Sequence, residues 1–348
     1  MSGPSAGRAG SSPGQDAVLA LDLGGTQIRA AVVENGGVVV AANRRPTPVA
    51  AGVAAIVEAC VDALAGARDA CVASLGERTF AGIGISSPGP VDPVAGVVVD
   101  PPNLGPTFRG TPLAALVGEA LGLPAFLDRD TQVAALAEGR FGAAAGCADF
   151  LYVTISTGIG GAIVSGGQLL RGPDGTAGEI GHLMVDRGGA PCGCGVRGHL
   201  EGIASGSGMA RSARAAAERG ESDRLAALVR EHGPAFGGRE VAAAAETGDP
   251  VAAAILAGAR DAFAVTCVSL VDVFNPSLIV VGGSVAMGQG EQMLAPARAA
   301  VAGGAFRRPG ARARIVPAAL GDDVGLVGGL VLVAERLATG AAGGPGGS

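Results

Sequence analysis

The sequence predicts an α/β protein made of two related halves. Each half opens with an apolar strand, a turn that contains glycine and threonine, and a second apolar strand, first at residues 18–33 and again at 150–164. Segments with apolar residues at helical spacing then alternate with short apolar runs, which is the pattern of α/β units. A chain of 348 residues also has room for two domains. We therefore expect two α/β domains that each bring a glycine turn to a shared cleft.

The first half is expected to start with three strands and a helix, at residues 18–22, 28–33, 38–42 and 53–64. A strand, a helix, a strand and a helix follow, at residues 81–86, 111–121, 125–128 and 131–140. The first domain is expected to span residues 17–127. A closing helix at residues 325–338 is expected to pack back on it.

The second domain is expected to span residues 128–324. Its strand at 150–156 is followed by a glycine turn at 158–161 and a strand at 162–164. Two long helices are then predicted at residues 207–219 and 250–273. A buried strand follows at 278–281, and the core of the closing helix is residues 326–337. Residues 1–16 and 339–348 contain few apolar side chains to bury, so both are expected to be disordered tails.

The charged residues exclude several classes of function. All 25 basic residues are arginine and the chain has no lysine, which excludes the lysine-dependent P-loop and Schiff-base chemistry. A net charge of −6 provides no basic face for nucleic acid. The apolar stretches are too short to predict a membrane span, and no signal peptide opens the chain. With six cysteines in so long a chain, we expect a cytoplasmic protein with neither nucleic acid nor membrane as partner.

The turn at residues 22–26 can bind a phosphate. Gly24 and Gly25 let an anion approach the main chain, Thr26 adds a hydroxyl donor, and Asp22 can hold a water of Mg²⁺. An ordinary hairpin turn explains this turn alone equally well. Similar strand ends recur at residues 156–158 and 282–283, and three such turns favour a nucleotide site.

Four potential metal ligands fall between residues 182 and 199. They occur in the order His182, Cys192, Cys194 and His199, and thiolate and imidazole donors in this number suit tetrahedral, structural Zn²⁺. The alternative is a chance cluster in a surface loop. The same segment contains a Gly-x-Gly-x-x-Gly pattern, but no strand precedes it, so it does not predict a dinucleotide site.

Four acidic residues flank or precede this loop. Asp128 and Asp130 follow a strand, Glu179 precedes His182, and Glu201 follows His199. Carboxylates accept hydrogen bonds from polyol hydroxyls, so these residues are candidates for a sugar site. The alternatives are solvated charges and helix caps, with Asp130 as an N-cap for the helix at 131–140.

Seven motifs together make the sequence resemble the ROK family (repressors, open reading frames and kinases), and within it the ATP-dependent glucokinases. They are Asp-Leu-Gly-Gly-Thr (22–26), Ser-Pro-Gly-Pro-Val-Asp (87–92), Pro-Asn-Leu (102–104), Asp-Arg-Asp (128–130), Ala-Gly-Glu-Ile-Gly-His (177–182), Cys-Gly-Cys-Gly-x-x-Gly-x-x-Glu (192–201) and Asn-Pro-x-x-Ile-Val-x-Gly-Gly (275–283). The resemblance covers residues 17–337. It implies an actin-like ATPase (ribonuclease H-like) duplicated fold, with two domains that close over a sugar and MgATP, and usually a homodimer.

The resemblance also implies a role for each matching residue. Asp130 would be the general base on the sugar 6-hydroxyl. Sugar hydroxyls would be contacted by Asn103, Glu179, His182 and Glu201, and His182 would also bind zinc. The nucleotide phosphates would face Asp22, Gly24, Gly25, Thr26, Thr157 and Gly158. The adenosine would face Gly282 and Gly283.

Some positions depart from the family pattern. His199 stands where the family usually has a third cysteine, and Arg129 replaces the asparagine that normally precedes the catalytic aspartate. Arg129 is larger and permanently charged, so it bears on which sugar is bound. Ser156 and Ala162 replace glycines near the phosphates, and both residues are small enough to be tolerated.

The expected function is ATP-dependent phosphorylation of a hexose, with glucose as substrate and glucose 6-phosphate as product. ATP, Mg²⁺ and a structural Zn²⁺ are the expected cofactors, and the expected assembly is a homodimer or a dimer of dimers. One alternative is a kinase for an N-acylated or amino sugar, such as N-acetylglucosamine or N-acetylmannosamine. Another is a sugar-binding regulator without kinase activity, for which the residues before Ala17 offer no room for a helix-turn-helix. ATP and polyphosphate both remain open as donors.

Overall fold

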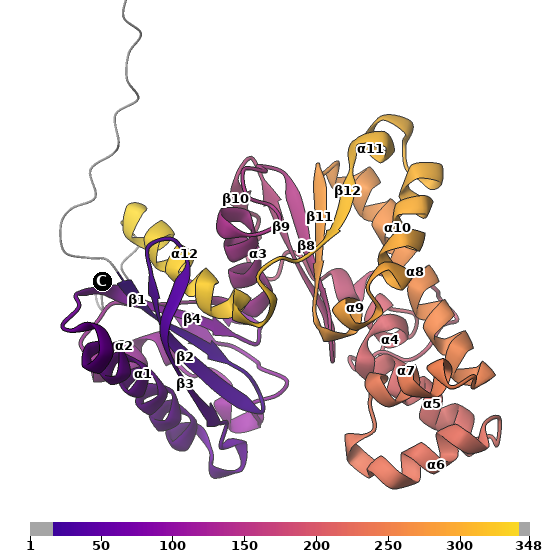
Figure 1. Cartoon of the computed structure of the whole chain (residues 1–348), viewed down its shortest axis with the longest axis horizontal. Coiled ribbons are helices and arrows are strands. Elements are labelled where there is room, and N and C mark those ends of the chain that lie inside the picture. Colours follow the sequence, from indigo (N-terminus) through magenta and orange to yellow (C-terminus); the bar gives the residue numbers. More distant parts are fainter. Residues whose placement is uncertain (1–16, 341–348) are drawn as a thin grey trace, which may run out of the picture. The chain divides into compact units, whose positions relative to one another are not determined.

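The structure of the chain is a computed structural model that describes residues 17–340. The tails expected at residues 1–16 and 339–348 lie outside the described residues, except for Thr339 and Gly340, whose N–H groups bond back to the last helix. The chain divides into two compact units (Figure 1). One contains the residues up to Asp130 and those from Gly325 onward, and the other is Thr131–Val324.

The first unit is built on a five-stranded sheet with the order β3-β2-β1-β4-β7. Strands β1 and β2 form an antiparallel hairpin, and β1, β4 and β7 are parallel. The strands are β1 (Ala17–Leu23), β2 (Gln27–Glu34), β3 (Val38–Pro46), β4 (Phe80–Ser87) and β7 (Ala125–Arg129). A small hairpin and four helical segments complete the unit before Asp130: β5 (Val91–Asp92), β6 (Val97–Val98), η1 (Val49–Ala51), α1 (Val53–Leu75), η2 (Pro106–Phe108) and α2 (Leu113–Leu121).

The two faces of this sheet carry different side chains because neighbouring residues of a strand point to opposite sides. Leu19, Leu21 and the isoleucines of β4 belong to the hydrophobic core that includes α1 and α2. On the other face, Ala20 and Gly84 lie against Gly329 of α12 (Val324–Ala338). A Cβ on Gly84 would come within 2.2 Å of the Gly329 carbonyl oxygen, so small residues allow α12 to approach the sheet closely.

The second unit repeats the same strand arrangement. Its sheet has the order β10-β9-β8-β11-β12, with an antiparallel pair β8 and β9 followed by parallel strands. This match confirms the predicted pair of related α/β halves. The strands are β8 (Phe150–Ile155), β9 (Ile159–Ser165), β10 (Gln168–Leu169), β11 (Leu278–Gly282) and β12 (Arg314–Pro317).

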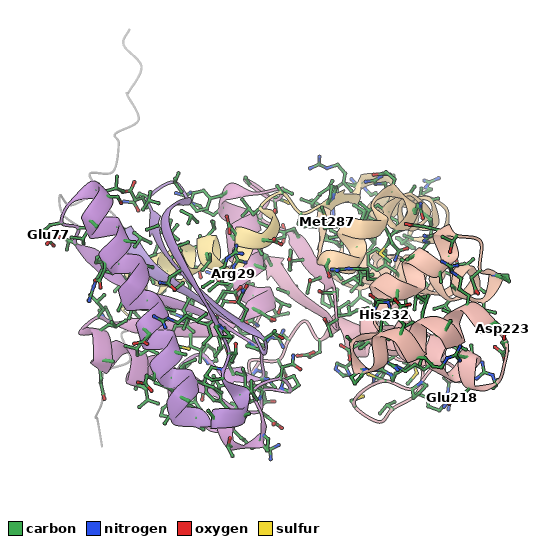
Figure 2. The ribbon with its side chains drawn as sticks, turned by 60° about the horizontal axis from the view of Figure 1, so that its bottom comes forward. Arg29, Glu77, Glu218, Asp223, His232 and Met287 are labelled. Carbon is green, nitrogen blue, oxygen red and sulfur yellow. The ribbon has the colours of Figure 1, made fainter. Side chains whose placement is uncertain are left out.

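Helices cover both faces of the second sheet. Phe150 and Tyr152 pack with alanines of α3 (Asp130–Phe141), while Leu151 and Val153 pack with residues of α8 (Pro250–Phe274) and α10 (Glu291–Gly304). A further cluster joins α5 (Gly206–Glu218), α6 (Asp223–His232) and α7 (Gly238–Glu246). The remaining segments are η3 (Ile180–His182), α4 (Leu200–Ala204), η4 (Gly233–Ala235), α9 (Ser284–Gln289), α11 (Arg307–Arg312) and η5 (Gly321–Asp323). Helix α6 carries Asp223 at its first residue and His232 at its last (Figure 2).

Helix α8 meets the length and composition of a membrane span, which the sequence prediction missed. It is 25 residues long, and such a helix is also typical of the core of a soluble protein. Here it packs against α10, α7 and α4 and supplies Phe263, Cys267 and Leu270 to the core of the second unit. Of the 18-residue stretch of this helix that meets the hydropathy criterion, 39% is buried within the structure.

Several sequence-based boundaries were wrong. Residues 128–130, expected in the second domain, belong to the first unit, since β7 pairs with β4 as far as Arg129 and Asp130 follows directly. The glycines expected in the turn at 158–161 are partly in a strand, because Gly160 and Gly161 pair with β8, so the turn is residues 156–158. Asp130 is the first residue of α3 and not its N-cap. The sequence analysis did not predict α6, α7, α9, α10, α11 or β12.

Candidate active site

Four polar residues form one row across the first sheet. Arg29, Asp22, Ser86 and Asp128 are register partners on β2, β1, β4 and β7. The Ser86 hydroxyl donates to Asp22 Oδ1 at 2.9 Å, and Arg29 Nη1 lies 3.9 Å from Asp22 Oδ2. Burial nevertheless raises the pKa of Asp22 above its ordinary value. The row lies where the parallel strands end, which is where open α/β sheets bind ligands.

The predicted phosphate turn follows directly after Asp22. The Gly24 N–H bonds to the Gln27 carbonyl at 2.9 Å, and the Thr47 hydroxyl donates to the Gly24 carbonyl at 2.6 Å. A Cβ on Gly25 would come within 2.6 Å of the Asn103 Cβ, so the absence of a side chain lets Asn103 lie against the turn. The first unit therefore brings Asn103, predicted for the sugar, next to the residues predicted for the phosphates.

The end of β7 places the predicted general base. Asp128 is fully buried, accepts a hydrogen bond from the Arg129 N–H at 2.9 Å, and lies 3.8 Å from Arg336 Nη2 of α12. The Arg129 side chain is also buried, and its stem packs against Gly89. Asp130 follows as an exposed residue at the first position of α3. Asp128 and Arg129 are thus buried and hold the backbone in place directly before Asp130, whose side chain is exposed.

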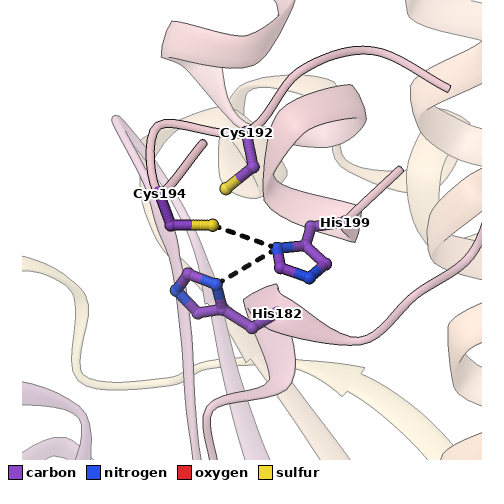
Figure 3. A group of neighbouring side chains, drawn as sticks. All are labelled: His182, Cys192, Cys194 and His199. Atoms are coloured by element: carbon purple, nitrogen blue, oxygen red, sulfur yellow. Dashed lines mark hydrogen bonds between the residues drawn. The ribbon is translucent and has the colours of Figure 1, made fainter. Parts of the chain in front are cut away.

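The second unit brings the four predicted metal ligands together. His182, Cys192, Cys194 and His199 place their donor atoms within 4.8 Å of one another (Figure 3). The two Nδ1 atoms are 3.3 Å apart, and Cys194 Sγ is 3.3 Å from His199 Nδ1. On a tetrahedral Zn²⁺ two nitrogens lie about 3.3 Å apart, and a nitrogen and a sulfur about 3.6 Å apart. These two distances match a zinc ion, and the 4.8 Å limit on the other donor pairs means that they need to shift by about 1 Å at most.

Backbone hydrogen bonds shape this metal loop, which comprises residues 182–199. The Val185 N–H bonds to the Gly198 carbonyl at 2.9 Å, and the Cys192 N–H bonds to the Val196 carbonyl at 2.8 Å. Gly198 has a φ of +82°, and a Cβ there would come within 1.6 Å of the Asp186 carbonyl oxygen. The Gly-x-Gly-x-x-Gly pattern therefore lies in the turns of this loop with no named strand directly before it, which agrees with the prediction that it is not a dinucleotide site.

The two acids beside the metal loop have different surroundings. Glu179 is exposed and directly precedes η3, which ends at His182. Glu201 is partly buried, and its carboxylate accepts a hydrogen bond from the Ile159 N–H at 3.0 Å. Its other oxygen lies 3.5 Å from Cys192 Sγ. Burial raises the pKa of the Cys192 thiol to about 11, whereas a bound cation would favour the thiolate.

A cavity of about 1110 Å³ lies within the second unit and is lined by residues of α5, α7, α8 and α9. Of the residues predicted for the nucleotide, Thr157 lines it, whereas Gly158, Gly282 and Gly283 do not. Gly283 instead has a φ of +90° and turns the chain from β11 into α9, whose Ser284 lines the cavity. The volume is ample for a nucleotide.

The sequence analysis missed most of the cavity lining. Two glutamates and four arginines line the cavity, and the arginines are Arg211, Arg214, Arg239 and Arg260. The Arg214 guanidinium lies 5.0 Å from the centre of the Phe236 ring, and Arg260 Nε donates to Gln289 Oε1 at 2.7 Å. The Gly-Ser-Gly run at residues 206–208, at the start of an Ala-rich helix, was the one available signal in the sequence.

Known proteins resemble this chain over most of its length. A model of the ROK family matches residues 18–336. A glucokinase of Halalkalibacterium halodurans is 33% identical over 319 residues, which cover 91% of this chain and 95% of that protein. The solved ROK family glucokinase from Streptomyces griseus, in complex with glucose and AMPPNP, is 34% identical with a TM-score of 0.72, over 90% of this chain and 97% of that one.

A second class of relative matches a shorter region. An N-acetylmannosamine kinase of Escherichia coli O157:H7 is 38% identical over 197 residues, which cover 56% of this chain and 64% of that protein. The two α/β units and the matches across the chain together confirm the expected actin-like ATPase fold. This chain belongs to the ROK family.

Proposed function

We propose that this protein is a sugar kinase that transfers the γ-phosphoryl group of MgATP to the 6-hydroxyl of a hexose, with glucose as the substrate. The observation that carries the proposal is the end of β7. There an exposed residue, Asp130, follows two buried residues. The glycine turn at 22–26 lies at the same end of the sheet, because β1, β4 and β7 are parallel. The relatives named glucokinase support the substrate.

Asp130 is the proposed general base. As the sugar O6 attacks the γ-phosphorus, Asp130 accepts the hydroxyl proton, and the bond from the γ-phosphorus to the bridging oxygen breaks to release ADP. The Gly24 N–H is already bonded to Gln27, so the close approach allowed by Gly24 and Gly25 and the Thr26 hydroxyl, together with Thr157 and Gly158, are proposed to position the phosphates. Mg²⁺ would neutralise phosphate charge, with Asp22 as the residue that holds one of its waters.

The sugar hydroxyls are proposed to bond to Asn103, Glu179, His182 and Glu201. The ring of His182 directs Nδ1 to the metal cluster, at 3.3 Å from His199 Nδ1. Its Nε2–H therefore remains as a donor to a sugar hydroxyl. A Zn²⁺ held by His182, Cys192, Cys194 and His199 would be structural, because four protein ligands complete its tetrahedral shell.

We also propose that the protein is a homodimer in the cytoplasm. The location rests on the small number of cysteines for a chain of this length. The dimer rests on the resemblance to the ROK family.

A kinase for an N-acylated hexose is the second candidate. The N-acetylmannosamine kinase with 38% identity favours it, as does the buried arginine, Arg129, that directly precedes the proposed base. This candidate requires the same acid, turn and metal loop, and differs only in which sugar substituents are bound.

A coupled assay for ADP release tests the proposal. Purified protein is given MgATP with glucose, mannose, N-acetylglucosamine or N-acetylmannosamine, and inorganic polyphosphate is offered as a second donor. We expect the highest kcat/KM with glucose and ATP. A preference for an N-acetylated sugar would favour the second candidate, and no transfer to any sugar from either donor would refute both.

A further inference from the structure

The Glu201 carboxylate lies between the metal loop and the turn at residues 156–158. One oxygen, Oε2, accepts the Ile159 N–H at 3.0 Å, just after that turn. The other, Oε1, is 3.5 Å from Cys192 Sγ in the metal loop. Both contacts lie within the second unit. A single side chain thus touches both the metal cluster and the backbone beside Thr157.

The turn at 156–158 is held on its other side by α5. The N–H groups of Gly206 and Ser207 donate to the carbonyls of Ser156 and Thr157, at 2.8 Å and 3.1 Å. Thr157, Gly206 and Ser207 all line the large cavity. A movement of this turn would therefore change the wall of the cavity where the nucleotide phosphates are proposed to bind.

Gly158 shows how closely the carboxylate approaches the turn. A Cβ at this position would come within 2.8 Å of Glu201 Oε2. Such a distance is shorter than real Cβ contacts, so a side chain at residue 158 would displace the carboxylate. The lack of a side chain at residue 158 thus allows the bond from Ile159 to Glu201.

The metal loop fixes Glu201 from two sides. Glu201 follows the ligand His199 by two residues, and its carboxylate faces the ligand Cys192. Its backbone is also tied down, since the Ser205 hydroxyl donates to the Glu201 carbonyl at 2.6 Å. An ion that holds His199 and Cys192 in place would restrict both the position and the orientation of the carboxylate.

We propose that Glu201 is a positioning residue that couples the metal site to the donor-phosphate turn. The proposal rests on the proposed function and adds a role to the sugar contact given there. Each carboxylate oxygen accepts more than one hydrogen bond, so the two roles are compatible. Zinc binding and nucleotide binding should then strengthen each other by the same factor.

The first test measures MgADP binding by calorimetry, which requires no turnover. Glu201→Ala removes the acceptor of the Ile159 N–H and should weaken MgADP binding about tenfold. Glu201→Gln keeps a carbonyl oxygen for that N–H and should bind MgADP within about threefold of the wild type. Glu218→Gln, at the exposed end of α5 (Figure 2), is the matched control and should bind like the wild type.

Gly158→Ala breaks the same link from the turn side, because its Cβ displaces the carboxylate while Glu201 itself is unchanged. It should weaken MgADP binding about as much as Glu201→Ala, in protein that still contains zinc by elemental analysis. If Glu201→Ala fails to fold, Gly158→Ala decides the question by zinc retention: saturating MgADP should then no longer slow zinc loss, whereas a lost phosphate contact alone would leave that effect in place.

The second test measures zinc retention against a zinc-selective chelator. MgADP should slow zinc loss from the wild type about tenfold and should have no such effect in Glu201→Ala. Unchanged MgADP affinity in both Glu201→Ala and Gly158→Ala, with only the sugar KM raised, would overturn the coupling and leave a sugar contact alone.

The coupling and the proposed function fail in different ways. If the wild type binds MgADP but phosphorylates no hexose, only the proposed function fails, and the zinc measurement still decides the coupling. If the wild type binds no MgADP, the coupling is overturned.

Discussion

Asp130 is the residue on which the proposed chemistry depends most. Its neighbour Asp128 is fully buried and Arg129 is 4% exposed, while Asp130 itself is exposed at the start of α3. A buried strand end gives an exposed side chain a defined position at no cost to the core. We therefore expect substitutions at Asp130 to change rate without changing the fold.

The variant Asp130→Asn keeps the size and polarity of the side chain but cannot accept the hydroxyl proton. Its kcat should fall about 10²–10⁴-fold, with the sugar KM within about threefold of the wild type. Steady-state kinetics measure both values, and circular dichroism checks the fold. Near-normal turnover in a folded variant would contradict the role of general base.

Glycine packing gives a second prediction at this scale. Gly84→Ala would place a Cβ 2.2 Å from the Gly329 carbonyl oxygen, so α12 would have to move off the sheet. The free energy of unfolding should fall by about 1–3 kcal/mol. Gly258 on α8 is the matched control, because a Cβ there meets nothing within 4 Å, and Gly258→Ala should stabilise the helix by about 1 kcal/mol. Equal effects of the two variants in chemical denaturation would contradict this account.

The metal loop is the element whose sequence pattern is most informative. Four potential ligands and five glycines within 18 residues predicted a cluster of metal-binding side chains on a loop with tight turns, because ligand spacing and glycine turns are local properties. Most of the strands and longer helices were also predicted, since their periodicity is local. Helices α6 and α7 were missed because they are short and rich in alanine and charged residues.

Zinc content tests the metal loop directly. Elemental analysis should find about one zinc per chain, and Cys194→Ala should retain less than a tenth of it, because three ligands hold zinc less tightly than four. The same variant should be cleaved faster within residues 182–199 in limited proteolysis. A fully active wild-type protein without zinc would contradict the structural role.

The start of α8 is capped by a titratable residue, so the stability of the protein should depend on pH. Asp249 caps this helix by accepting the N–H groups of Val251 and Ala252, and it accepts a hydrogen bond from the Ser222 hydroxyl. Burial disfavours the charged carboxylate, but these hydrogen bonds together outweigh it and hold the pKa of Asp249 below its ordinary value of 3.8. Because the pKa is lower in the folded chain, the stabilisation is complete above the ordinary value and is lost as the pH falls below it.

The variant Asp249→Asn should lower the free energy of unfolding by about 1 kcal/mol at pH 7. It should also lose less stability than the wild type between pH 5 and pH 3, because asparagine does not titrate. Chemical denaturation at a series of pH values measures both effects. Parallel curves for the two proteins would show that Asp249 does not contribute to the acid dependence.

At the scale of the whole molecule, the chain consists of two α/β units with the same strand arrangement. The last helix, α12, returns to the first unit, where Gly329 lies against Ala20 and Arg336 lies 3.8 Å from Asp128. In the described part of the first unit, residues from opposite ends of the sequence therefore pack against each other. A truncation after Val324 should expose the face of the sheet that contains Ala20 and Gly84.

We expect such a truncated protein to lose the first unit while the second keeps its core. Hydrogen exchange should then show fast exchange in β1 and β4 and continued protection in β8 and β11. Unchanged protection of β1 and β4 after truncation would contradict the role of α12.

The sequence by itself determined most of the strands to within a few residues, the approximate positions of the glycine turns, the cluster of four potential metal ligands and the family resemblance. These are local patterns of residue type and spacing, and each was readable without knowledge of distant contacts. Only the tertiary structure decided that Arg29, Asp22, Ser86 and Asp128 share one row, because register joins residues from four separate strands. It likewise decided which residues of α5, α7, α8 and α9 line the cavity, and that one oxygen of Glu201 bonds to Ile159. Such contacts depend on the packing of elements far apart in the chain, which periodicity and spacing do not specify.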